Sequence, residues 1–95
     1  MTTDQIKKRL SILLVNLKKK YPIKSFEIFG SYARGDQTEV SDLDILVEFN
    51  DKIGIRFIDL AEELEQKTGM KVDLVSRNAV KKGYLKEISK DLISV

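Results

Sequence analysis

The stretch from Gly30 to Val47 constrains the fold of this chain more than any other part of the sequence. It opens with a Gly-Ser pair, passes through a short polar linker and ends in an alternating run. That run places Leu43, Ile45 and Val47 on one face of a predicted strand. Glycine permits a tight turn and a close approach of the backbone to another group. The stretch therefore predicts a turn, a short helical segment and a strand with one face in the core.

Length and composition limit the class of protein further. The chain has 95 residues and a hydrophobic content of 42%, which predicts one domain over residues 1–95 with no room for a second. It contains no cysteine and no histidine, which excludes disulfide frameworks, thiolate zinc sites and imidazole bases. Any metal must therefore be held by oxygen ligands. With no signal peptide and no apolar run of the ~18 residues that span a bilayer, we expect a cytoplasmic protein without membrane contact.

The basic residues are clustered, although the net charge is only +2. The clusters are Lys7-Lys8-Arg9, Lys18-Lys19-Lys20 and Lys81-Lys82. Such runs are typical of solvated helix faces, and they also occur in nucleic-acid patches. Few aromatic residues accompany them, so we favour solvated helix faces and do not expect nucleic acid as the direct substrate.

Hydrophobic periodicity predicts seven elements in the order α-β-α-β-α-β-α. They are a helix from a Thr2 or Thr3 cap to about Lys20, a strand over 24–29, a short helix from Tyr32 capped by Ser31, a strand over 42–49, a helix over 55–67 that Gly69 ends, a strand over 71–75, and a helix from Val80 through Leu92. This order predicts an α/β (α+β) fold, a small mixed β-sheet with helices packed on one face. In the 55–67 helix, Ile55, Ile58, Ala61 and Leu64 form the predicted apolar stripe, which Phe57 and Leu60 widen.

Two carboxylates open the second predicted strand. Residues i and i+2 of a strand project from the same face with Cα atoms ~6.5 to 7 Å apart, so Asp42 and Asp44 converge in front of the sheet. Like charges this close are tolerated mainly around a cation, most simply Mg²⁺. If Asp73 lies on an adjacent strand and faces the same way, three carboxylates could hold two Mg²⁺ ions ~3.5 to 4 Å apart, an arrangement suited to phosphoryl or nucleotidyl transfer. The Gly30-Ser31 turn would offer backbone N–H groups and a hydroxyl to a triphosphate.

Each of these signals alone has an ordinary structural interpretation. An Asp-x-Asp pair at a strand start often faces water, Asp73 could be a solvated strand residue, and Ser31 could be a simple helix cap. In combination and in this order, however, Gly30-Ser31-x-Ala33-Arg34-Gly35 and Ser41-Asp42-x-Asp44 resemble the motifs of the minimal nucleotidyltransferases (MNT) of the DNA polymerase β superfamily. The resemblance covers nearly the whole chain, since the length and the α/β order also fit.

The resemblance implies a polymerase β-like nucleotidyltransferase fold and a role for each motif residue. Asp42 and Asp44 would be metal ligands, and Asp73 would be the third carboxylate, which orients or deprotonates the acceptor hydroxyl. Gly30 and Ser31 would bind the β and γ phosphates of the nucleotide.

Arg34 would support the motif, either by a salt bridge that fixes the turn, which we favour, or by a phosphate contact. The reaction implied is attack of a hydroxyl on the α-phosphorus of ATP with release of pyrophosphate, and two Mg²⁺ ions are expected. ATP is the donor typical of the family. No aromatic residue is placed so that it predicts a stacking platform for the base.

Small members of this class resemble antitoxins that neutralise a HEPN-type ribonuclease toxin by transferring AMP to a tyrosine hydroxyl of that toxin. This implies a protein partner and allows a homo- or hetero-oligomer. The alternative is a non-catalytic antitoxin of the same fold that inhibits its partner by binding. Three converging carboxylates favour the enzyme, because a pure binder has no physical reason to hold them. Transfer to a small antibiotic is disfavoured because no second domain could enclose a drug, and templated polymerisation is disfavoured further.

Overall fold

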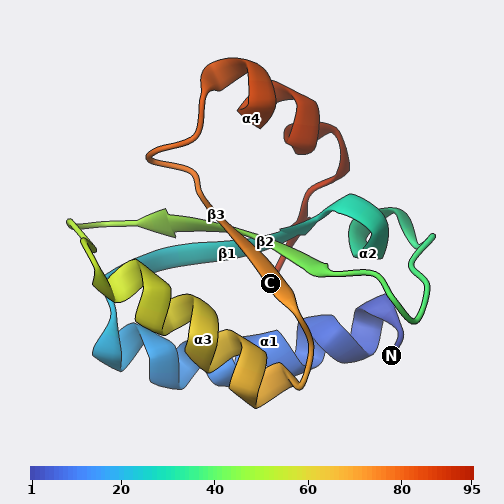
Figure 1. Ribbon diagram of the computed structural model, residues 1–95, viewed down its shortest axis with the longest axis horizontal. Helices are drawn as coiled ribbons and strands as arrows, with labels where there is room; N and C mark the ends of the chain where they lie inside the picture. The colour runs from blue at the N-terminus through green and yellow to red at the C-terminus, as the bar shows by residue number, and fades with distance from the viewer.

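The computed structural model describes all residues from 1 to 95 (Figure 1). Its elements are α1 (Thr3–Lys20), β1 (Ile23–Phe29), α2 (Gly30–Arg34), β2 (Leu43–Phe49), α3 (Arg56–Thr68), β3 (Val72–Ser76), α4 (Lys82–Ile88), the 3-10 turn η1 (Ser89–Asp91) and β4 (Ile93–Ser94). The four strands form one sheet in the order β3-β2-β1-β4, in which β2 and β3 are parallel and the other pairs antiparallel. The predicted mixed α/β class is confirmed. No helix is both long enough and apolar enough to cross a membrane, and the cytoplasmic location stays a prediction.

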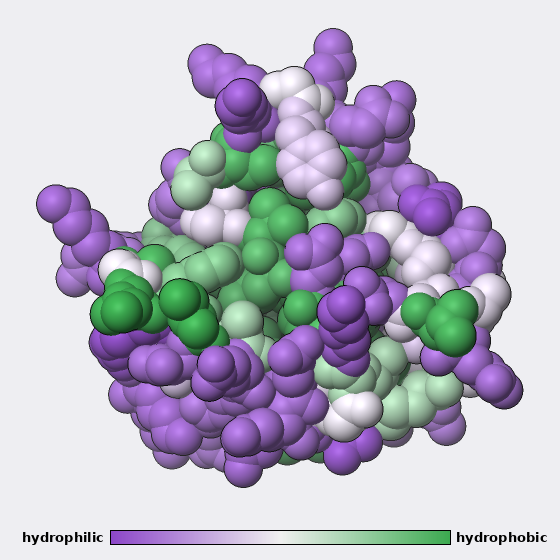
Figure 2. Space-filling view, viewed as in Figure 1, coloured by the Kyte–Doolittle hydropathy of each residue, from purple (hydrophilic) through white to green (hydrophobic).

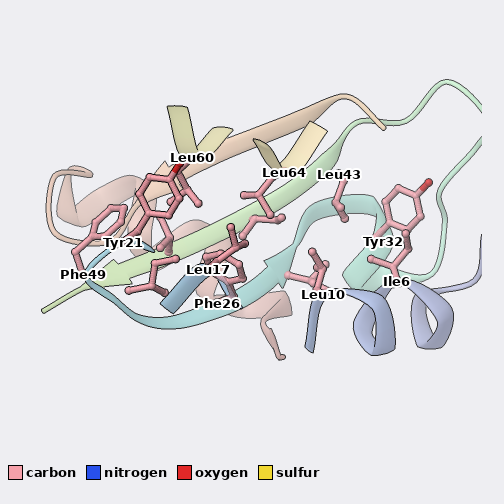
Figure 3. Packing of buried hydrophobic residues seen from close by; sticks show 14 residues of the cluster. Ile6, Leu10, Leu17, Tyr21, Phe26, Tyr32, Leu43, Phe49, Leu60 and Leu64 are labelled. Carbon is pink, nitrogen blue, oxygen red and sulfur yellow. The ribbon is translucent and has the colours of Figure 1, made fainter. Parts of the chain in front are cut away.

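The helices lie on both sides of the sheet. α1 and α3 pack side by side on one face, and α4 lies over the other face, which we call the open face (Figure 1). The core lies between the sheet and the helices α1 and α3, where Leu10, Leu17, Phe26 and Leu64 are fully buried (Figure 3). The prediction that the helices pack on one face of the sheet therefore holds for α1 and α3 only. α4 differs because the chain leaves β3 at one edge of the sheet and must cross the open face to reach β4 at the other.

The predicted start of the first helix is confirmed in detail. Thr2 is the N-cap of α1 and forms a capping box with Gln5. The Gln5 N–H donates to Thr2 Oγ1 at 3.2 Å, and the Thr2 N–H donates to Gln5 Oε1 at 2.9 Å. The helix ends at Lys20, just before Tyr21-Pro22, as expected from the loss of a backbone donor at proline.

The predicted apolar stripe of α3 is wrong at two positions. Ile55 is 82% exposed and Ile58 is 57% exposed, and Figure 2 shows hydrophobic side chains on the surface near the start of α3. The helix begins only at Arg56, and its buried residues are Leu60, Leu64 and Thr68. Their spacing of four residues turns Ile58 outward, because one face of a helix repeats every three to four residues. Gly69, with φ 68°, ends the helix as predicted.

The predicted C-terminal helix is wrong beyond Ile88, where α4 ends. The chain instead makes η1 and then β4, a strand of two residues that the sequence analysis did not predict. β4 pairs with the free edge of β1, with Ile93 opposite Ile28 and Ser94 opposite Glu27. Unpaired backbone groups at a sheet edge favour this addition, and Ile93 also packs against the core.

An ion-pair cluster spans the open face under α4. Arg77, which follows β3, pairs with Glu27 of β1 and lies 3.9 Å from Glu48 of β2. These three side chains are 19% to 31% exposed, so water screens them only in part.

Replacing Arg77 by Met should lower the free energy of unfolding by about 1–2 kcal/mol, because Glu27 and Glu48 lose a partly buried counter-charge. Urea denaturation followed by circular dichroism measures the change. The matched control is Lys24→Met, since Lys24 also pairs with Glu48, at 3.5 Å, but is 62% exposed and should contribute almost nothing. Equal losses in the two variants would contradict a special role for Arg77.

Candidate active site

Asp44 and Asp73 lie side by side on the open face of the sheet. The parallel register of β2 and β3 pairs Asp44 directly with Asp73, and neighbours in register project to the same side. Leu43 and Ile45, on either side of Asp44, are fully buried on the opposite face. The prediction that Asp73 turns toward the two motif carboxylates is therefore consistent with the structure.

Asp42 lies one residue before β2, and not within the strand as predicted. Its negative charge is nevertheless close enough to affect the pKa of Asp44. The pKa of Asp44 is raised to about 6, first by burial, then by the negative charges of Asp73 and Asp42 and by a hydrogen bond with Asp73, while Arg34 opposes the shift. Asp44 with Asp73 is thus a close pair beside Asp42. As they stand, the carboxylates do not form a ready cluster of three metal ligands.

Gly30 is in direct contact with Asp44. It follows Phe29, which pairs with Asp44 across β1 and β2, and it has a φ of 72°. A Cβ added to Gly30 would overlap the Asp44 carboxylate. Glycine is therefore needed here for two reasons, the left-handed backbone and the space that the carboxylate occupies.

A cavity of about 520 Å³ opens in front of this contact. Its lining residues from the predicted motif are Gly30, Ser31, Arg34, Ser41, Asp42 and Asp44, with Phe29 behind them. The opposite wall comes from the end of α4 and from η1, and consists of Glu87, Ile88, Lys90 and Asp91. Asp73 lies beside Asp44 but does not itself line the cavity. None of the residues of the opposite wall was predicted from the sequence, since the position of this wall depends on β4.

The two serines of the motif have different structural roles. Ser31 is not the cap of α2 as predicted, because the helix already includes Gly30 and its N-cap, Phe29, makes no side-chain bond. Ser31 lies in the first turn, where backbone N–H groups have no partner within the helix. Ser41 fixes the loop before Asp42, since its hydroxyl accepts the N–H of Thr38 at 2.8 Å.

Arg34 forms the salt bridge that the sequence analysis favoured. Its Nε lies 3.2 Å from Asp36 Oδ2, just past the turn at Gly35, and its Nη1 lies 4.0 Å from Asp91 Oδ2 on the opposite wall. Arg34 therefore joins α2 to η1 across the cavity. Asp36 is exposed.

The residues present fit a divalent cation of the magnesium type. All side chains that could bind it here are oxygen donors, which is the donor type that Mg²⁺ prefers. Burial and the negative charges of Asp73 and Asp42 raise the pKa of Asp44, and Arg34 offsets only part of this shift. A divalent cation between Asp42 and Asp44 would relieve that repulsion.

The pKa of Asp44 predicts how stability changes with pH. Because its folded-state pKa, about 6, exceeds the ordinary value of 3.8, the protonated form favours the fold. Stability from this group is therefore lost as the pH rises from about 4 to about 6. In metal-free buffer, Asp44→Asn should gain about 1 kcal/mol over the wild type between pH 4.5 and pH 7.5, a value reduced because water screens a half-buried group. Urea titrations at both pH values measure it, and a difference independent of pH would contradict the assignment.

The fold and the site together define a nucleotidyltransferase. The chain belongs to the nucleotidyltransferase domain family, whose model matches residues 10–94. A predicted protein adenylyltransferase of Methanocaldococcus jannaschii is 52% identical over 81 residues, which are 83% of this chain and 83% of the relative. The protein adenylyltransferase MntA of Thermococcus cleftensis is 34% identical over 96 residues, which are 100% of this chain and 97% of the relative. The resemblance found in the sequence is confirmed.

Solved structures agree with this family. A predicted minimal nucleotidyltransferase matches with a TM-score of 0.79 and 28% identity, over 100% of this chain and 97% of its own. A toxin-antitoxin crystal structure with AMP-PNP matches with a TM-score of 0.73 and 25% identity, over 85% of this chain and 68% of that one. A complex of an MNT antitoxin with a tri-AMPylated HEPN toxin of Shewanella oneidensis matches with a TM-score of 0.69 at 21% identity, over 95% and 69%, which is a likeness of fold.

Proposed function

We propose that this nucleotidyltransferase is a magnesium-dependent protein adenylyltransferase that moves AMP from ATP to a tyrosine hydroxyl of a HEPN-type ribonuclease toxin. In this function it would act as the antitoxin of a toxin-antitoxin pair. The observation that carries the proposal is the register of β2 and β3, which sets Asp73 beside Asp44, and Asp44 lines a cavity together with Asp42 and the Gly30-Ser31 turn.

The site residues divide into two groups in this reaction. Asp42 and Asp44 would hold Mg²⁺, which when bound supplies positive charge opposite the phosphates of the nucleotide. Gly30 and Ser31 bind the β and γ phosphates through their backbone and hydroxyl groups, and Gly30 lets the phosphates approach the backbone closely. Asp73 orients the acceptor hydroxyl and takes its proton.

The chemistry is a single displacement at phosphorus. The tyrosine oxygen forms a bond to the α-phosphorus, the bond between that phosphorus and the bridging oxygen of the β phosphate breaks, and pyrophosphate leaves with the electron pair. Positioning and charge supply most of the rate in such reactions.

Two features support a protein as the acceptor. The cavity is bounded by charged and polar side chains from α2, β2 and η1, and apart from Phe29 and Ile88 it offers no apolar wall for a small drug-like molecule. The relatives similar in sequence include a protein adenylyltransferase, and structural neighbours come from toxin-antitoxin complexes, one of them with an AMPylated HEPN toxin. An acceptor carried on a partner protein fits both features.

The experiment is to incubate the chain with ATP labelled in its α phosphate, Mg²⁺ and its HEPN-type partner. We expect label on the partner, and tandem mass spectrometry should place the AMP group on a tyrosine. Asp42→Asn combined with Asp44→Asn should abolish labelling and still bind the partner. Inhibition of the toxin without label, unchanged in the double variant, would instead establish a non-catalytic antitoxin that acts by binding.

A further inference from the structure

The wall of the cavity opposite the motif is positioned by β4. Ile93 and Ser94 of β4 run antiparallel to Ile28 and Glu27, so the residues just before β4 return along β1 toward its end. That end leads directly into Gly30. η1 therefore lies next to the Gly-Ser turn, and the 4.0 Å approach of Arg34 and Asp91 links the two walls.

Only two cations line this cavity, Arg34 and Lys90. Arg34 has two carboxylate partners, Asp36 and Asp91, which compete with a ligand for its charge. Lys90 has one partner, Glu87, at 3.2 Å, and these side chains are 65% and 70% exposed. An exposed pair of this kind contributes little to stability, so a stronger anion can displace Glu87 with little loss.

We propose that Lys90 binds the β and γ phosphates of the donor nucleotide, and thereby stabilises the pyrophosphate as it leaves. The proposal rests on the proposed function, which places a nucleotide in this cavity. A polyphosphate carries more negative charge than Glu87 and competes successfully for the ammonium group. Lysine suits the task because its flexible stem carries a compact charge that can follow the phosphates. As the bond between the α-phosphorus and the bridging oxygen breaks, negative charge grows on the pyrophosphate, and the positive charge of Lys90 on the cavity wall stabilises it.

The test measures binding of ATP, AMP and pyrophosphate to the full chain by calorimetry in the presence of Mg²⁺. Lys90→Gln should weaken the binding of ATP and of pyrophosphate about tenfold, the typical effect of losing one hydrogen bond to a charged group. AMP lacks the β and γ phosphates, so its affinity should stay unchanged. Lys86→Gln is the matched control, because Lys86 is an exposed lysine of α4, four residues before Lys90, that does not line the cavity. Glu87→Gln should tighten the binding of ATP by removing the competitor.

The outcomes separate this proposal from the proposed function. If the wild type binds ATP and labels its partner but Lys90→Gln binds ATP equally well, the role of Lys90 is overturned and the enzyme assignment stands. A parallel loss of ATP and AMP binding in Lys90→Gln would also overturn it, since that result indicates a structural role. If the wild type binds no ATP, both proposals fall together.

Discussion

Replacing Asp44 by Asn should reduce AMP transfer by a factor on the order of 10³ or more. Asp44 is the innermost of the carboxylates and is close to both Asp73 and Asp42. An amide keeps the shape of the side chain and removes the charge that would hold Mg²⁺. Loss of one charge-stabilising group at a transition state commonly costs a factor of 10² to 10³, and a metal ligand should cost at least as much. The measurement is the initial rate of label transfer from ATP at saturating partner concentration.

The matched control for this variant is Asp51→Asn. Asp51 is an exposed carboxylate just past the other end of β2, and the Lys52 N–H that it accepts can be accepted by Asn as well. This variant should transfer AMP at the rate of the wild type. Because Asp44→Asn relieves repulsion, it should also melt at or above the wild-type temperature in metal-free buffer at pH 7.5. Clear destabilisation of that variant would mean that Asp44 has a structural role instead.

Replacing Gly30 by Ala produces the second large effect, a loss of both stability and transfer. The φ of 72° costs about 1–2 kcal/mol for a residue with a Cβ. Overlap of the new methyl group with the Asp44 carboxylate should add about 1–3 kcal/mol and force the carboxylate out of place. We expect a total of about 2–5 kcal/mol from urea denaturation, and transfer reduced nearly as much as in Asp44→Asn.

Gly35 provides the control, because it has a similar φ of 81° but no atom close to the position of an added Cβ. Gly35→Ala should show the backbone strain alone and retain activity. A double-mutant cycle between Gly30→Ala and Asp44→Ala then isolates the overlap. In the Asp44→Ala background, the stability lost at Gly30 should shrink to that seen at Gly35. Unchanged loss in that background would show that Asp44 does not cause the effect.

The sequence predicted the part of the site that is built from strongly patterned elements. The alternation of Leu43, Ile45 and Val47 indicated which face of β2 is buried, and so toward which side Asp44 projects. Val72 and Leu74 alternate with Asp73 in the same way, so the sequence also separates Asp73 from the apolar side of its strand. That Asp73 lies beside Asp44 was only a condition in the sequence analysis, and the register of β2 and β3 supplies it. These predictions depend on short-range periodicity, which the buried face of a sheet enforces strongly.

The rest of the site depends on contacts that leave no local pattern. β4 consists of two residues and exists because β1 offers a free edge, so nothing in Ile93-Ser94 itself predicts a strand. The cavity wall that carries Lys90 is positioned through β4 and was missed for that reason. Ile58 fits a helical period but is exposed. The sequence of α3 contains two overlapping apolar stripes, and packing against the sheet buries the one that contains Leu60 and Leu64.

The register between β2 and β3 ties assembly of the site to correct folding. A slip of one residue along this ladder would turn Asp73 toward the layer of α1 and α3 and expose Val72 and Leu74 on the opposite side. The mispaired sheet would escape the repulsion between Asp44 and Asp73, but it would bury an unpaired charge in the hydrophobic core. The hydrophobic side chains of Val72 and Leu74 thus fix the register that places Asp73 beside Asp44. The affinity of the folded protein for Mg²⁺ should therefore indicate whether β2 and β3 have paired in the correct register.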